Sequence, residues 1–205
     1  MIKYKLLNQD RTTYAGMEWP IGQWNEATGD PDQSLCTDGW LHCYDDPYLA
    51  LFLNSVHANI QDPIVCEVEV NGDSKNDRGL KRGYRKMRVI KDLNIVRPTT
   101  EQQTKFAIYC ALEVYDDPDF KQWANNWLLG TDRSKETAWA ATRAAEAAAW
   151  AAAEAAEAAA AAEAAQAAQA AHAAVWAARA ARVAEAIDID FVAITRKAME
   201  GSVPT

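Results

Sequence analysis

Pro63 to Gly72 reads PIVCEVEVNG and alternates between apolar and acidic side chains. The two sets are Ile64, Cys66, Val68 and Val70 on one side, and Val65, Glu67 and Glu69 on the other. Successive side chains of a strand point to opposite faces, so the pattern predicts a β-strand with one buried and one solvated face. Such a strand is typical of an antiparallel sheet that has one face in water.

Further short strands are predicted on both sides of this one. They are Met1 to Leu7, Thr12 to Trp19, Trp40 to Tyr44 and, after a basic stretch, Lys86 to Val96. Between them, Asp46 followed by Pro47 predicts a helix start, with apolar residues at helical spacing as far as Ile60.

Helices are predicted after the last strand. Thr99 or Thr100, with a glutamine three residues later, resembles a capping box and opens a helix as far as Tyr115. A second helix follows Asp117-Pro118 and ends at Gly130. Asp188 or Asp190 caps a last helix, 191–199. The fold class predicted from this order is α+β.

Alanine dominates the next part of the chain. Between Ala138 and Ala186, 32 of 49 residues are alanine, and no Gly, Pro, Asn or Asp occurs from Ser134 to Ile187. Alanine has the highest helix propensity, so we expect a long helix here, either single or folded into a hairpin. Aromatic anchors and the opposite all-alanine face are the expected interface: Trp139, Ala148, Trp150, Ala159 and Trp176. The predicted domains are a head at 1–132, the Ala-rich segment at 133–187 and a C-terminal helix and tail at 188–205.

Charge and hydropathy exclude several classes. The 205-residue chain has a net charge of −8, so a general nucleic-acid binder is not expected. It has no apolar run of about 18 residues and no leader-like N-terminus, which predicts a soluble, cytoplasmic protein with no membrane partner. Four irregularly spaced cysteines in a chain this long indicate free thiols rather than a disulfide framework.

Cys36, His42 and Cys43, with Cys66 as a further ligand, are the candidate metal ligands, because thiolate and imidazole are the groups that zinc prefers. Paired C-x-x-C elements are missing, and adjacent residues on a strand point to opposite faces. We therefore expect no metal and no other cofactor. In the alternative interpretation Cys43 is a small buried side chain and His42 bonds a neighbouring strand.

Basic residues are concentrated between Lys75 and Lys91, which hold eight of the 21 lysines and arginines. The candidate binding residues for an anionic partner are Lys81, Arg82, Arg85, Lys86 and Arg88. The alternative is that they balance the acidic face of the preceding strand across a hairpin.

Leu35-Cys36-x-x-Gly39-Trp40-Leu41-His42-Cys43-x-x-x-Pro47, together with the later acidic Cys66 to Val70, resembles a group of small phage and prophage proteins. Their N-terminal domain reads C-x-x-G-[aromatic]-H-x-C, followed by a Pro-led helix and an acidic strand. Members often carry low-complexity, Ala-rich helical tails. The resemblance implies a phage-associated protein, located in the host cell cytoplasm or the virion, and no defined chemistry.

Glu67-x-Glu69 also resembles the E-x-E element of ADP-ribosyltransferases. That resemblance implies a catalytic Glu69, an acceptor-directed Glu67 and a contact between His42 and NAD. The arginine or histidine on a first strand and the Ser-Thr-Ser strand of that family are absent from this sequence.

Three hypotheses follow from the sequence. The first is a non-enzymatic structural or interaction protein that self-associates or docks on a protein partner through its Ala-rich helix. The second is an NAD-binding enzyme with His42, Glu67 and Glu69 in its cleft. The third is an inhibitor of a host defence system that acts by protein binding.

Overall fold

The structure is a computed structural model that describes residues 1–13, 16–113, 116–134 and 189–200. The chain divides into two compact units, of which the first comprises Met1–Pro98 and Asp190–Thr195. The second comprises Thr99–Ile189, as far as it is described, and the residues from Arg196 onward. The range expected to be one head, 1–132, therefore spans parts of both units. The expected Ala-rich helix and its interface residues lie outside the described residues.

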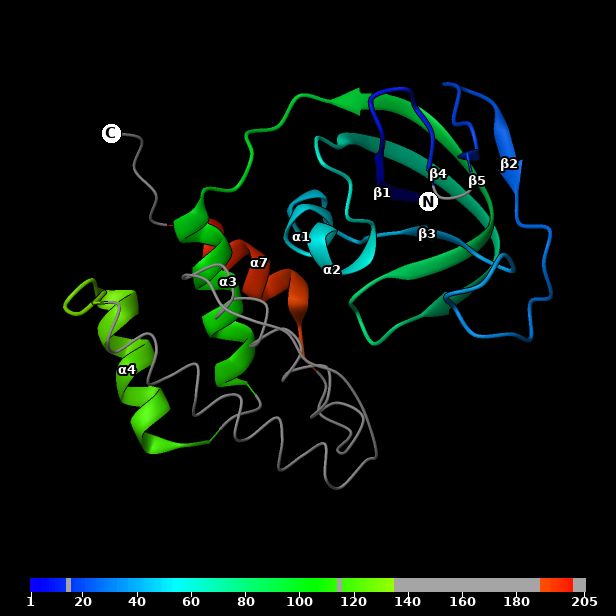
Figure 1. The fold of residues 1–205 in the computed structure, drawn as a ribbon. Coiled ribbons are helices and arrows are strands. Elements are labelled where there is room, and N and C mark those ends of the chain that lie inside the picture. Colours follow the sequence, from blue (N-terminus) through cyan, green and yellow to red (C-terminus); the bar gives the residue numbers. More distant parts are fainter. Residues whose placement is uncertain (14–15, 114–115, 135–188, 201–205) are drawn as a thin grey trace. The chain divides into compact units, whose positions relative to one another are not determined.

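An antiparallel sheet forms the first unit (Figure 1). Its strands in the described part are β1 (Ile2–Leu7), β2 (Trp24–Glu26), β3 (Leu41–Cys43), β4 (Ile64–Asn76) and β5 (Arg82–Leu93). The order is β1-β4-β5-β2, and β3 pairs with β5 beside β2. One long strand, β5, thus carries β4 along one edge and both short strands along the other.

A backbone bridge between Tyr4 and Tyr44 joins β1 to the end of β3. The amide of Tyr4 donates to the carbonyl of Tyr44 at 3.0 Å, and the amide of Tyr44 donates to the carbonyl of Tyr4 at 2.8 Å. Tyr4 lies in β1 and Tyr44 directly follows β3, so β1, β4, β5 and β3 form a closed ring of strands. The bridge covers the edge of β1 at Tyr4, while β2 remains an edge strand.

The apolar core lies against this curved sheet. Its members are mostly completely buried: Leu7, Trp19, Ala27, Leu41, Cys43, Cys66, Val68, Val70, Tyr84, Met87 and Val89. The alternation predicted for β4 is confirmed at Cys66, Val68 and Val70, which are buried, while Glu67 and Glu69 are half-buried. Val65 is also buried, because it lies between Leu6 of β1 and Leu93 of β5.

The predicted helix after Asp46 is present but divided. The Asp46 carboxylate accepts from the amides of Tyr48 and Leu49 and caps α1 (Pro47–Phe52). A short α2 (Asn54–His57) follows. The side chain of Asn54 then bonds both the amide and the carbonyl of Ile60, which turns the chain before the predicted end.

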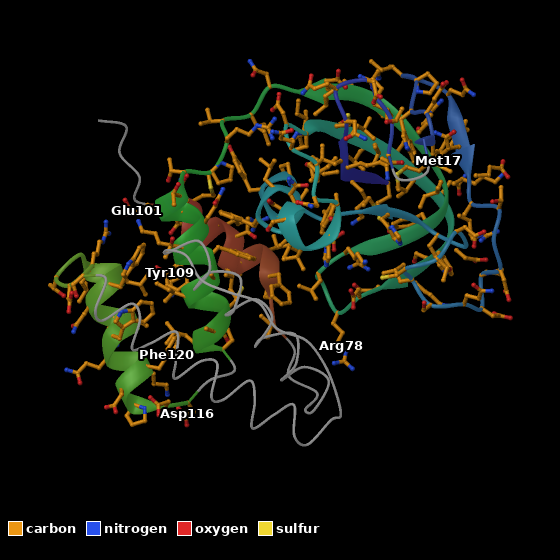
Figure 2. All side chains as sticks on the ribbon, in the orientation of Figure 1. Met17, Arg78, Glu101, Tyr109, Asp116 and Phe120 are labelled. Atoms are coloured by element: carbon orange, nitrogen blue, oxygen red, sulfur yellow. The ribbon has the colours of Figure 1, made fainter. Side chains whose placement is uncertain are left out.

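The second unit contains α3 (Thr100–Leu112) and α4 (Pro118–Leu129). Thr99 and Gln102 form the predicted capping box, and Gly130 ends α4 with φ 75°. Small residues of both helices meet Phe120 and Trp127 in an apolar cluster: Ala107, Ala111 and Ala124. Figure 2 labels Glu101, Tyr109 and Phe120 on these helices.

The last described helix, α7 (Phe191–Met199), begins after Asp190, whose carboxylate accepts from the amide of Ala193.

Several strand assignments differ from the sequence prediction. The short strand β2 was not predicted, and β4 extends to Asn76, four residues beyond the predicted Gly72. Thr12 to Trp19 is not a strand in its described part, since only Thr12 and Glu18 pair and Met17 bonds back to Thr13. The basic stretch from Arg82 is part of β5 rather than a loop. In the described part of the chain, no helix is long and apolar enough to cross a membrane.

Candidate functional site

The segment from Leu35 to Cys43 folds over the first half of β5. Register places Leu41 opposite Tyr84, His42 opposite Gly83 and Cys43 opposite Arg82. The Nε2–H of His42 donates to the carbonyl of Leu35, which ties the two ends of the segment together. The sequence motif is therefore a single folded loop, and Figure 2 shows the neighbouring β4–β5 hairpin with Arg78 at its tip.

Two cations bind backbone carbonyl oxygens between Ala27 and Gly39 and so hold the chain that leads into this loop. The guanidinium of Arg85 donates to the carbonyls of Gly29, Gly39 and Ala27, at 2.9, 2.5 and 3.0 Å. The ammonium of Lys75 donates to the carbonyls of residues 31, 32 and 33, at 3.0, 3.2 and 2.5 Å. Hydrogen bonds from charged donors are stronger than neutral ones, so these contacts fix a loop that has little regular structure.

Trp40 lies between these two cations. Its ring centroid is 5.2 Å from Lys75 Nζ and 5.9 Å from Arg85 Cζ. A Cβ added to Gly83 would lie 2.8 Å from Trp40 Cβ and 2.3 Å from Leu35 Cδ1. Glycine at this position of β5 is therefore what allows the loop to approach the strand.

Cys36, in this loop, is exposed. Its sulfur contacts Lys81, the residue directly before β5. The Nζ of Lys81 lies 3.1 Å from Cys36 Sγ. Lys81 itself is buried, with 7% of its surface exposed. The turn from Asp77 to Lys81, closed by a 2.9 Å hydrogen bond from the amide of Asp77 to the carbonyl of Lys81, places this side chain beneath the loop.

His42 is held as a neutral imidazole. Burial lowers its pKa from 6.5 to about 4, against the opposing hydrogen bond to Leu35, and the positive charges of Lys5 and Lys81 lower it further. Since Nε2 donates to a carbonyl, the lone pair is on Nδ1. An imidazole with so low a pKa is a poor general base near neutral pH.

Lys5, in β1, is a buried lysine that lies against an aromatic ring. Its Nζ lies 4.2 Å from the ring centroid of Trp19 and donates to the carbonyl of His42 at 2.9 Å. Burial lowers the pKa of Lys5 to about 8, while burial raises the pKa of Cys43 and of Cys66 to about 12. These two thiols are therefore protonated, unreactive parts of the core.

A shared carboxylate connects three elements nearby. Asp45 accepts from Lys3 of β1 at 2.5 Å and from Arg82 of β5 at 2.6 Å. The hydrogen bonds and charges of both cations hold the pKa of Asp45 below its usual value, although its partial burial opposes them. This group ties β1 and β5 to the start of α1.

The candidate anion-binding residues do not gather on one free surface. Arg88 Nη2 bonds Glu69 at 2.6 Å, Lys86 bonds Glu26 at 2.6 Å, and Arg82 bonds Asp45. Arg85 binds backbone carbonyls and Lys81 contacts Cys36.

The candidate catalytic residues are far apart. His42 pairs with Gly83, and Glu69 pairs with Arg88, five positions further along β5. At about 3.3 Å per residue this is a separation of roughly 16 Å along the strand. Glu67 is beyond that point, opposite Lys91, whose ammonium lies 3.3 Å from its carboxylate.

The candidate zinc ligands are likewise separated. Cys43 is completely buried, Cys36 is exposed, and His42 bonds Leu35. Among the described residues, no group of three or more His, Cys, Asp and Glu side chains is placed to hold a metal ion.

Sequence reasoning missed the roles of Lys5, Asp45 and Lys75. Lysine in a terminal strand and aspartate before a helix are ordinary surface residues by composition. The one available signal was that Lys5 stands within the apolar strand Met1 to Leu7, directly before two leucines. The candidate interface residues of the Ala-rich segment lie outside the described residues.

No curated protein and no solved structure matches the chain. Residues 1–99 match a family model described as a domain of unknown function, DUF7666. The match ends one residue after Pro98, where the first unit's N-terminal range ends. The β-rich N-terminal part of this chain is therefore similar to the DUF7666 family.

Proposed function

We propose that the chain is a non-enzymatic, phage-associated interaction protein of the cytoplasm. The α+β range 1–132 is its head, and the Ala-rich segment at 133–187 is the part that self-associates or docks on a protein partner. The sequence basis for that segment is its continuous alanine content, whose methyl groups permit close approach of another helix.

The observation that favours this proposal over the NAD-binding alternative is the register of β5. It separates His42 from Glu69 by five positions and engages Glu67 and Glu69 with Lys91 and Arg88 across the strands. A general acid–base or NAD-binding cleft needs these groups within hydrogen-bond reach of one reacting atom. Paired carboxylates on a half-buried strand are instead the typical solvated face of a sheet.

Sedimentation velocity of the full chain over a wide concentration range tests the proposal. We expect self-association that strengthens with concentration, or a monomer that acquires mass with a protein partner. Calorimetric titration with NAD is expected to show no binding. A monomer that binds NAD would overturn the proposal and favour the enzyme.

The double variant Glu67→Gln, Glu69→Gln distinguishes an interaction protein from an NAD-binding enzyme. Both carboxylates are partly exposed, so the loss of their ion pairs is expected to change the free energy of unfolding by less than about 1 kcal/mol. Association and biological activity should persist. The outcome that would contradict the proposal is a folded double variant that has lost activity, with Glu26→Gln as the matched control for loss of a cross-strand pair.

A further inference from the structure

We propose that Cys36 and Lys81 form a reactive thiol site, at which Cys36 exchanges with small disulfides. The proposal rests on the 3.1 Å contact between Lys81 Nζ and Cys36 Sγ and on the opposite exposures of the two side chains. It is independent of the interaction function proposed above.

Lys81 is buried, and its ammonium is directed at the sulfur. In the described part of the chain no carboxylate forms an ion pair with it, and its recorded hydrogen bond goes to Cys36. A buried ammonium without a counter-charge is unfavourable, and a neutral thiol is a weak acceptor. At 3.1 Å from Sγ, Nζ is placed to serve as the counter-charge of a thiolate, the form of cysteine that acts as a nucleophile.

The loop presents the sulfur to solvent while its backbone is held. Lys75 binds carbonyls before Cys36, and Arg85 binds the carbonyl of Gly39 after it. The bond from His42 to Leu35 fixes the residue directly before Cys36. All four cysteines are in the described part, and Cys43, Cys66 and Cys110 are buried. Reaction of the folded chain is therefore expected at Cys36 alone.

The reaction is thiol–disulfide exchange with a low-molecular-weight disulfide, R–S–S–R. The Cys36 thiolate attacks one sulfur, a new bond forms between Sγ and that sulfur, and the S–S bond of the reagent breaks. The leaving thiolate carries away the electron pair and takes a proton from water as its own basicity dictates. Cys36 sulfur is oxidised and the leaving sulfur is reduced, so no further oxidant is needed.

The test uses dithiodipyridine, an uncharged aromatic disulfide, on the folded full chain at neutral pH. We expect one thiol per chain to react rapidly, roughly tenfold faster than the thiols of the chain unfolded in guanidinium, and three to react slowly. Cys36→Ser should remove the rapid phase. A rapid phase that persists in Cys36→Ser, or a folded-state rate no higher than the unfolded one, would overturn the proposal.

Substitutions of the lysine test the charge. Lys81→Met is expected to slow the rapid phase roughly tenfold, and Lys81→Arg to retain most of it, because the positive charge remains. Lys91→Met removes one positive charge from the distant end of β5 and should leave the rate unchanged. An unchanged rate in folded Lys81→Met contradicts the proposal. If Lys81→Met does not fold, the proposal is tested by comparing the rate of thiol reaction in folded wild type with that in unfolded wild type.

Discussion

Lys5 is the side chain whose ionisation bears most directly on stability. Its pKa is about 8 in the folded chain against 10.5 when exposed, so the unfolded chain binds more protons between these values. The contribution of Lys5 to stability therefore rises with pH across this window, and its full penalty is present below pH 8. The raised pKa values of Cys43 and Cys66 act in the opposite direction above pH 9, equally in wild type and in Lys5→Met. We expect Lys5→Met to be more stable at pH 7 by about 1–3 kcal/mol, since the lost contacts to Trp19 and His42 offset part of the gain.

Denaturant unfolding of both proteins from pH 7 to 11 measures this effect. The difference between wild type and Lys5→Met should shrink as pH approaches 10.5. Lys91→Met, which changes an exposed lysine, should leave the pH slope as it is in wild type. Equal slopes for wild type and Lys5→Met would show that Lys5 keeps its charge in the folded chain.

Side-chain roles were predictable where local spacing determines them. Asp46, Thr99 and Gly130 cap helices as their neighbours in sequence indicate. The contact of Cys36 with Lys81 and the sharing of Asp45 by Lys3 and Arg82 join residues tens of positions apart. Only strand register brings such pairs together, and register depends on the whole sheet.

The loop from Ala27 to Trp40 requires glycine at position 39, because the backbone of Asp30 lies too close for a Cβ there. A Cβ on Gly39 would lie 2.3 Å from the backbone oxygen of Asp30 and 3.0 Å from its carbonyl carbon. Since backbone cannot rotate away as a side chain can, Gly39→Ala is expected to lower the free energy of unfolding by about 1–3 kcal/mol.

Thermal or denaturant unfolding checks this prediction. Ser34→Ala, in the same loop and on an exposed residue, is the control and should stay within about 0.5 kcal/mol of wild type. A Gly39→Ala protein as stable as wild type would mean that the loop moves away from Asp30 without loss of packing.

Strands were predictable to the extent that their own alternation is regular. β1, β3 and β4 coincide closely with the predicted ranges, because each carries a run of β-forming residues next to a turn signal. β2 has three residues and exists through its pairing with Met87 and its neighbours in β5. The predicted strand began only at Lys86, after the basic stretch, whereas β5 begins at Arg82. Gly83, which weakens a strand pattern, is the glycine that the Trp40 loop requires.

The organisation of the chain into a head and an Ala-rich segment rests on composition. The described residues show that the predicted head comprises parts of two units, a β-rich one and a helical one. Contact between distant residues defines that boundary, whereas composition changes only later, near Ser134. Assembly through the Ala-rich segment is therefore a separate hypothesis, with its own test.

The alanine face of that segment is the expected packing surface. On a helical wheel of about 100° per residue with Arg143 at zero, Ala148 and Ala159 lie near 140° and 160°, roughly opposite Glu154. Large side chains there would force a partner helix outward, so Ala148→Leu with Ala159→Leu is expected to weaken assembly, or the fold itself, by about 1–3 kcal/mol. Sedimentation and melting measure both effects. Glu146→Gln with Glu154→Gln should change little, and a neutral or stabilising leucine pair would mean that this face packs against nothing.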